Sequence, residues 1–292
     1  MDLKSFIQYW DEYLNDWMHD AKQKMTDELK CGHYFCNSKV LQSNIDYLPE
    51  PYYGNPFDSS AVIIDLNPGL SSSFDYRKKR PVGDLFLEVQ KMSYSDFNEK
   101  YSPFLDSSLA TIGTLYEIPG AKWWRDNRMK WIGSFLKDYM KCTGTLEPHH
   151  SNSPFVMELC PWHSKKWTDS IIRGMESHLY NTVFEPARLA IKSSSFNKFG
   201  FCFGKVAGDA LLKNSFVVAR LWNKEHPVGE WPLNKEKEPT NRTYRLLKRE
   251  INGEIFYFLN LYADGTFHTP SEEFRKKVEP ALIKELVKIV EL

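Results

Sequence analysis

Two short, nearly continuous apolar runs constrain the fold of this chain more than any other feature of its 292 residues. The first run spans residues 61–66 (AVIIDL), and the second lies within residues 154–162 (PFVMELCPW). Apolar runs of this length are typical of strands that are buried on both faces of a parallel sheet. Segments with helical periodicity alternate with these and other strand-like runs. The pattern therefore predicts an α/β fold, with a central, mostly parallel sheet that helices cover on both faces.

The rest of the pattern favours one domain preceded by a helical extension. Phe6, Trp10, Leu14 and Trp17 recur at helical spacing, so we expect an N-terminal helical extension over residues 1–45. Residues 46–292 then form a single α/β domain, because no internal repeat or low-complexity linker divides them. Further helices are expected near 84–98, 129–139, 169–193 and 271–292, further strands near 199–203, 215–222 and 254–262, and a hairpin in the charged segment between the last two strands.

Charge, hydropathy and cysteine usage exclude several classes of protein. The formal charge is zero, which disfavours a protein that coats nucleic acid non-specifically. No apolar run approaches the roughly 18 residues of a membrane span, and the acidic first segment lacks the pattern of a signal peptide. The five cysteines are scattered, as is common for reduced thiols. We therefore expect a cytoplasmic protein with no membrane partner and no obligatory protein partner.

The segment CGHYFC, residues 31–36, contains potential metal ligands. Cys31, His33 and Cys36 can contribute to a metal or iron–sulfur site if a second pair of ligands completes it. The sequence has no second pair at a standard spacing. We therefore expect no metal and no other cofactor.

Polar side chains stand where three of the predicted strands end. Asp65 and Asn67 follow the first apolar run, Glu158 ends the second, and His268 follows the last strand in YADGTFHTPS. In open parallel sheets, ligands bind outside the carboxyl ends of the strands. Each residue also has a structural explanation: Asn-Pro-Gly is a common turn, Glu158 can pair with a neighbouring Lys or Arg, and His268 can lie on a surface loop.

Taken together, LPEPYYGNP (residues 48–56), LNPG (66–69) and ELCPW (158–162) resemble the uracil-DNA glycosylase superfamily. The likeness is to branches whose first motif reads Gly-Ile-Asn-Pro-Gly or Gly-Met-Asn-Pro-Gly, and to the Asn-x-Cys-Pro-Leu segment of single-strand-selective uracil glycosylases. It implies a uracil-DNA glycosylase-like fold and hydrolysis of the N-glycosidic bond of a base flipped out of DNA. Asn67 matches the asparagine that orients the attacking water. Pro68, Gly69, Leu70 and Glu158 are then expected around the base.

Asp65 stands where this family usually has glycine. Residues two apart on an extended strand project to the same side, so Asp65 and Asn67 are expected to face one site. A carboxylate there can act as a general base or stabilise the positive charge that develops on the sugar. The alternative is that Asp65 only accepts hydrogen bonds from the backbone amides of the turn. No lysine occupies the Asn67 position to form a Schiff base, so a monofunctional enzyme that leaves an abasic site is expected.

Two departures from the family pattern concern the substrate. Glu158 stands where the single-strand-selective branch has asparagine; an ionised carboxylate only accepts hydrogen bonds, which suits the amino group of cytosine and not the O4 atom of uracil. Gly69 stands where classical uracil enzymes have a tyrosine that crowds the C5 position of the base. Both changes favour an amino-bearing pyrimidine with a bulky C5 substituent, such as glucosylated hydroxymethylcytosine, the substrate class of bacterial antiviral glycosylases in this superfamily.

The second catalytic motif of the family, His-Pro-Ser-Pro or Asn-Pro-Ser-Gly, has no exact match; FHTPS is the candidate for it, and His268 is then expected near the scissile sugar. EHPVGEWP around His226 is a rival by its letters, although its position before a later strand favours His268. Positive charge for DNA binding is expected in two segments that follow the motif strands, with KWWRDNRMKW (122–131) as a third basic and aromatic segment. The residues of the two segments are Arg77, Lys78, Lys79, Arg80, Lys165 and Lys166.

Three other functions remain open at this point. The chain can be a uracil-DNA repair glycosylase, a glycosylase-like protein that binds DNA without chemistry, or a hydrolase of free nucleosides or nucleotides. The basic runs can likewise be ordinary solvated surface, as most charge runs are.

Overall fold

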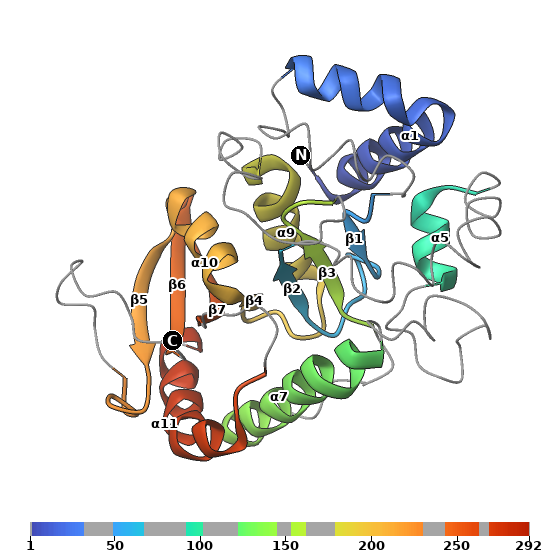
Figure 1. Cartoon of the computed structure of the whole chain (residues 1–292). Helices are drawn as coiled ribbons and strands as arrows, with labels where there is room; N and C mark the ends of the chain where they lie inside the picture. The colour runs from blue at the N-terminus through green and yellow to red at the C-terminus, as the bar shows by residue number, and fades with distance from the viewer. Residues whose placement is uncertain are drawn as a thin grey trace.

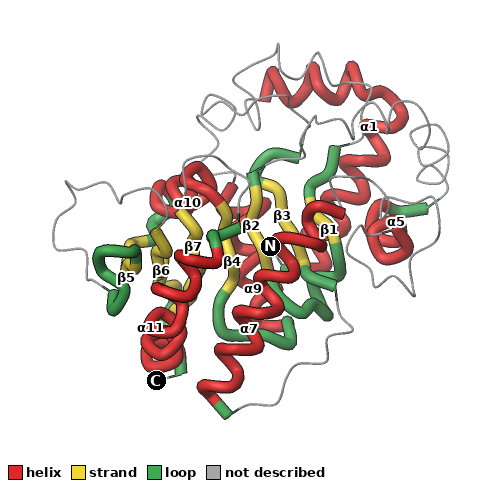
Figure 2. Tube along the Cα trace, turned by 60° about the horizontal axis from the view of Figure 1, so that its bottom comes forward, coloured by secondary structure: helices red, strands yellow, loops and turns green. Residues whose placement is uncertain are grey.

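The computed structural model describes residues 2–31, 49–66, 92–101, 122–144, 153–161, 179–229, 243–262 and 269–291. Seven strands within these ranges form one sheet in the order β1-β3-β2-β4-β7-β6-β5 (Figure 2). The four central strands β3, β2, β4 and β7 run parallel, whereas β1, β6 and β5 pair antiparallel with their neighbours. The strands are β1 (Tyr52–Tyr53), β2 (Val62–Asp65), β3 (Phe155–Glu158), β4 (Gly200–Phe203), β5 (Val217–Trp222), β6 (Thr243–Ile251) and β7 (Glu254–Tyr262).

Helices lie on both faces of this sheet, as the alternating pattern predicts. Figure 1 shows α7 (Lys130–Thr143) and α11 (Glu272–Val290) on one side, and α9 (Glu185–Ser193) and α10 (Gly204–Lys213) on the other. The expectation of an α/β fold with a mostly parallel centre is confirmed at this level. The other described helices are α1 (Leu3–Cys31), which has a kink at Asp20, α5 (Tyr94–Tyr101), and the π-helical turns η2 (Trp124–Met129) and η4 (Tyr180–Phe184). Within the described ranges, no helix is long and apolar enough to cross a membrane.

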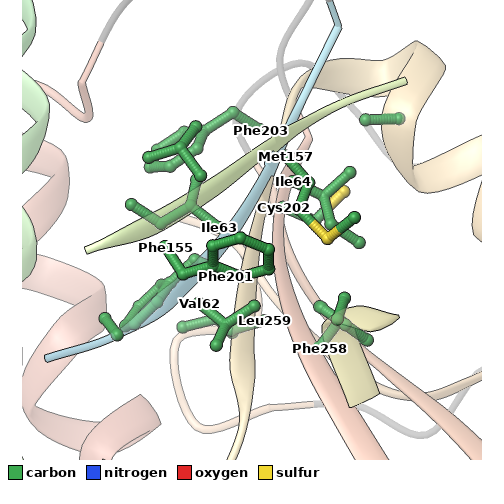
Figure 3. Close-up of a cluster of buried hydrophobic side chains, with 14 of the residues drawn as sticks. Val62, Ile63, Ile64, Phe155, Met157, Phe201, Cys202, Phe203, Phe258 and Leu259 are labelled. Atoms are coloured by element: carbon green, nitrogen blue, oxygen red, sulfur yellow. The ribbon is translucent and has the colours of Figure 1, made fainter. Parts of the chain in front are cut away.

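The two apolar runs form the middle of the core. Val62, Ile63 and Ile64 of β2 are fully buried between β3 and β4, and Figure 3 shows side chains of β2, β3, β4 and β7 in one cluster. Burial of one such side chain contributes about 1.5–3 kcal/mol to folding. The apolar side chains of α1 reach the same core, where the Phe6 ring lies 5.2 Å from the Tyr52 ring. Because helices cover both faces of the sheet (Figure 1), side chains on both sides of these strands are buried, which explains why neither run alternates with polar residues.

The β6–β7 hairpin is shaped by a tight turn at Asn252 and Gly253. Both residues have positive φ, 53° and 81°, as a two-residue type I′ turn requires, and Asn-Gly is the sequence that favours this turn. The charged segment supplies β6, which forms a hairpin with the following strand β7, so the described part of the segment contains one strand and not both strands of the predicted hairpin. The C-terminal helix also begins as expected, because the Ser271 hydroxyl accepts a hydrogen bond from the Phe274 amide.

The order of the parallel strands creates a topological switch point. The chain leaves β2 towards β3 on one side and then returns across β2 to β4 on the other side. In sheets of this kind, the crevice between the two central strands, here β2 and β4, is where ligands bind, outside their carboxyl ends. Asp65 is the last residue of β2, so its side chain lies at this position.

Candidate functional site

Asp65 and Glu158 lie side by side at the carboxyl ends of β2 and β3. They are register partners in the parallel pairing, and their side chains therefore point to the same face of the sheet. Neighbouring strands are about 4.8 Å apart, so the two carboxyl groups share one site. Asp65 is 4% exposed and Glu158 is 6% exposed. Two buried carboxylates at this edge require compensation, because burying a charge without a partner is costly.

Arg128 supplies the compensation for Asp65. Its Nη1 atom donates to Asp65 Oδ2 in an ion pair that joins residues 63 positions apart in the sequence. Arg128 is 1% exposed, which makes it one of the largest fully buried side chains among those described. A buried ion pair gains little net stability over apolar packing, because its desolvation penalty offsets the Coulomb attraction. Stability therefore does not explain the pair, and its position at the switch point makes it a candidate for a functional role.

Aromatic rings hold the Arg128 guanidinium in place. Its central carbon lies 4.3 Å from the centre of the Trp124 ring and 4.5 Å from that of Phe203, with Trp123 at 5.4 Å. Phe203 is the last residue of β4, so Arg128 bridges the ends of the two strands that flank the switch point. Arg128 and Trp124 both belong to the π-helical turn η2, a rare element that occurs often at functional sites.

The second oxygen of Asp65 has no partner among the described residues. Asp65 Oδ1 is buried and accepts no hydrogen bond there. An unpaired buried acceptor costs about 1–3 kcal/mol, so such an atom in a native fold calls for an explanation. A donor to this oxygen would come from a ligand, from a water molecule or from a part of the chain outside the described residues.

The three segments that carry the family resemblance are adjacent in space. β1 lies within residues 48–56 and pairs with β3, which pairs in turn with β2. Hydrogen bonds continue this contact beyond the strands: the Glu158 amide donates to Pro51 O at 3.0 Å, and the Cys160 amide donates to Leu66 O at 3.0 Å. The ends of β2 and β3, with the residues that follow them, are thus held together as one unit.

A polar network on the other face of the sheet fixes the end of β4. Asn260 Nδ2 donates to the backbone oxygens of Cys202 and Gly204, both at 3.0 Å, while Asn260 Oδ1 accepts from Arg245 Nε at 2.9 Å. Burial raises the pKa of the Cys202 thiol in this network, so the thiol stays protonated and is a poor nucleophile. The network supports the turn that joins β4 to α10 and is not a reactive site.

Most of the predicted site residues lie outside the described residues. Only Asp65 and Glu158 are described, and the structure brings these two together. Predictions for the others stay predictions: Asn67, Pro68, Gly69, Leu70, His268, Arg77, Lys78, Lys79, Arg80, Lys165 and Lys166. Asn67–Leu70 directly follow the described end of β2, and Lys165 and Lys166 follow that of β3.

The strand order bears on the choice between His226 and His268. His226 follows β5, which is four strands away from β2, or roughly 19 Å at the usual strand spacing. His268 follows β7, which is two strands away and parallel to β2, so the chain leaves β7 at the same edge as the candidate site. The preference for His268 is therefore consistent with the topology, although His268 itself is not described.

The expectation that KWWRDNRMKW contacts DNA is wrong for two of its residues. Arg128 is buried against Asp65, and Trp131 is buried with its Nε1 atom donating to Glu279 Oε1 at 2.8 Å. A basic and aromatic pattern also suits a buried cation between rings, and the sequence contains no signal that separates the two cases. Arg128 is the functional candidate that sequence reasoning missed.

The described residues contain no group of three or more His, Cys, Asp or Glu side chains that could hold a metal ion. Comparisons of the chain with protein-family models, with curated proteins and with solved structures each gave no match.

Proposed function

We propose that the protein is a monofunctional DNA glycosylase that acts on an amino-bearing pyrimidine with a bulky C5 substituent, such as glucosylated 5-hydroxymethylcytosine. The observation that carries this proposal is the register pairing of Asp65, at the end of β2 beside the switch point, with Glu158 at the end of the neighbouring strand β3. The Asn-Pro-Gly motif of the family resemblance begins two residues after Asp65, at Asn67. A base flipped into this edge would meet both carboxylates and that motif.

The proposed chemistry is hydrolysis of the bond between the base and the sugar C1′. As this bond breaks, the sugar becomes oxocarbenium-like, and a positioned water molecule completes the reaction. We assign the orientation of this water to Asn67, and a supporting role near the sugar to His268. Glu158 accepts a hydrogen bond from the exocyclic amino group, and Pro68, Gly69 and Leu70 surround the ring.

The pair between Asp65 and Arg128 refines the role of the Asp65 carboxylate. Arg128 offsets the negative charge of Asp65, so this carboxylate contributes less to stabilising a positive sugar than an unpaired one would. Of the two catalytic roles expected for Asp65, charge stabilisation is the weaker. DNA is the proposed partner, with Arg77, Lys78, Lys79, Arg80, Lys165 and Lys166 as phosphate contacts and defence against phage as the proposed setting.

The proposal is tested by incubating the protein with DNA duplexes and single strands that carry different modified bases. Free base is measured by mass spectrometry, and the Asn67→Ala variant serves as the control. We expect release of the C5-substituted cytosine, a much slower release of uracil, and loss of at least about 100-fold in rate for the variant. Equal release of uracil would contradict the role of Glu158.

A second candidate is a protein of the same architecture that binds DNA without chemistry. The low exposure of Asp65 and Glu158 favours this candidate, because carboxylates that are buried in the fold suit a structural role. In that case neither the wild-type protein nor the Asn67→Ala variant releases base, and both bind DNA with an affinity that falls as salt is raised. Activity on free nucleosides that is unchanged when Arg77–Arg80 are neutralised would instead indicate a small-molecule hydrolase.

A further inference from the structure

The geometry around Asp65 points to a residue that reads the substrate. We propose that Asp65 Oδ1 accepts a hydrogen bond from a donor on the bound base and that Arg128 is the positioning residue that fixes this oxygen. The inference rests on the proposed function, because it names the feature of the base that this site selects. The favoured ligand is a base with an amino group at the edge that faces β2.

The first step of the argument is that Asp65 has one committed oxygen and one uncommitted oxygen. Oδ2 accepts from Arg128 Nη1, while Oδ1 is buried with no hydrogen-bond donor among the residues that the structure describes. A guanidinium only donates, so Arg128 can be satisfied by either oxygen but fixes whichever one it holds. The other oxygen is thereby aimed in a constant direction.

The second step is that Arg128 cannot easily move. The rings of Trp124 and Phe203 contact the guanidinium at 4.3 Å and 4.5 Å, and they come from different elements, η2 and β4. Functional groups that must meet a ligand are held in this way by residues whose own conformations are locked by packing. Burying the Asp65–Arg128 pair costs desolvation energy, and in return Asp65 Oδ1 is held as an acceptor in a fixed position at the switch point.

The third step concerns the character of the site. Asp65 and Glu158 place two buried carboxylates on neighbouring strands, and Arg128 pairs with the first of them. Two acceptors on neighbouring strands, about 4.8 Å apart, favour a base edge with donors over one with a carbonyl oxygen. Asp65 would thus act with Glu158 in selecting an amino-bearing base.

Asp65→Asn tests this reading without a change of shape. Because Arg128 only donates, an asparagine at this position must turn its carbonyl oxygen towards Arg128. Its NH₂ group then stands where Oδ1 stood, so the acceptor becomes a donor. The test ligands are two DNA duplexes that carry glucosylated 5-hydroxymethylcytosine or glucosylated 5-hydroxymethyluracil at one position; these bases differ at the amino or carbonyl group of C4 and in protonation at N3.

Binding is measured by fluorescence anisotropy and base release by mass spectrometry, for both duplexes. We expect the preference of the wild-type protein for the cytosine derivative to fall at least about tenfold in Asp65→Asn. Asp138→Asn, which alters an exposed ion pair with Lys141, is the matched control and should leave the preference unchanged. If Asp65→Asn does not fold, the Arg128→Lys variant is used in its place. The lysine keeps the positive charge beside Asp65 but loses the planar contacts of the guanidinium, so the preference for the cytosine derivative should fall.

The outcomes separate this inference from the proposed function. If Asp65→Asn lowers binding and base release equally for both duplexes, the inference is overturned, because Asp65 then acts on the water or the sugar, or supports the chain after Leu66. A preference that persists in Asp65→Asn, with base release intact, also overturns it and leaves the glycosylase proposal standing. A shifted preference in binding, with no base released from either duplex, supports the inference and contradicts the glycosylase proposal.

Discussion

Asn260 donates a hydrogen bond of 3.0 Å to the backbone oxygen of Gly204, and this contact ties β7 to the turn that begins α10. Gly204 has a φ of 85°, a conformation that other residues rarely adopt, so the turn depends on a glycine at this position. The same asparagine accepts from Arg245, which also stacks on the Tyr262 ring at 4.4 Å. This network therefore supports the end of β4 from the face of the sheet opposite to the one on which Phe203 contacts Arg128.

Because of this network, any side chain at Gly208 of α10 is predicted to lower the stability of the protein. A Cβ atom at Gly208 would lie 2.4 Å from Arg245 Nη2 and 2.4 Å from Asn260 Oδ1. We expect Gly208→Ala to lower the free energy of unfolding by about 1–3 kcal/mol, although alanine favours helices. Gly133→Ala in α7 is the control: nothing lies within 4 Å of its Cβ position, so the change should raise stability by up to about 1 kcal/mol. Urea unfolding of both variants checks this, and equal effects would contradict it.

Glu279 is predicted to anchor α11 to the sheet and to α7. Its Oε1 atom accepts from Trp131 Nε1 at 2.8 Å and from the Tyr244 hydroxyl at 2.7 Å. Glu279→Leu leaves both donors buried without this acceptor, and we expect it to cost about 2–4 kcal/mol of stability. Glu279→Gln keeps an acceptor and should cost less than half as much. Denaturant unfolding measures both, and a stable Glu279→Leu protein would show that the contacts are dispensable.

Stability is predicted to fall at alkaline pH. Burial is the largest cause that raises the pKa values of Tyr52, Tyr139 and Tyr244, and the carboxylates of Glu291 and Glu279 act in the same direction on the last two. The unfolded chain loses these protons near pH 10 while the folded protein keeps them. The unfolded state then binds fewer protons, so the free energy of unfolding decreases as pH rises above about 10. Urea unfolding from pH 8 to 11 should show this decrease, and a smaller one in Tyr244→Phe; a flat profile would contradict it.

The ion pair between Arg128 and Asp65 is predicted to be costly to break from one side. Arg128→Met leaves the buried Asp65 charge without its partner, and we expect a loss of about 3–5 kcal/mol. The double variant Asp65→Leu with Arg128→Met should recover most of this loss. Lys141→Met is the matched control, since the Lys141–Asp138 pair has side chains that are 64% and 53% exposed and should contribute less than about 1 kcal/mol. Thermal unfolding compares the four proteins, and a large effect of Lys141→Met would remove the distinction.

The parallel centre of the sheet was predictable because β2 and β3 are buried on both faces and therefore read as apolar runs. β6 was less visible, since Arg245 and Lys248 interrupt its pattern. Arg245 is tolerated there only because Asn260, Asp209 and Tyr262 surround it in the folded chain. The Asn252–Gly253 turn was the available signal for this strand.

The candidate site was predictable to the extent that it depends on strand ends. Asp65 and Glu158 each follow an apolar run, and parallel pairing then places them together. Arg128 was not predictable, because its partner Asp65 is distant in the sequence and its aromatic neighbours equally suit a DNA-contacting surface. Only tertiary packing distinguishes a guanidinium clamped between Trp124 and Phe203 from one that is exposed to phosphate.

The most direct measurement is the formation of abasic sites in DNA that carries glucosylated 5-hydroxymethylcytosine at one position. The wild-type protein and the Asn67→Ala variant are each incubated with this DNA, which is present in excess over the enzyme. Strand breaks at alkali-labile sites are then counted. The account predicts breaks at the modified position with the wild-type protein and almost none with Asn67→Ala, although both proteins bind the DNA. Tight binding by the wild-type protein without any alkali-labile site, on this DNA or on others with modified bases, would contradict it.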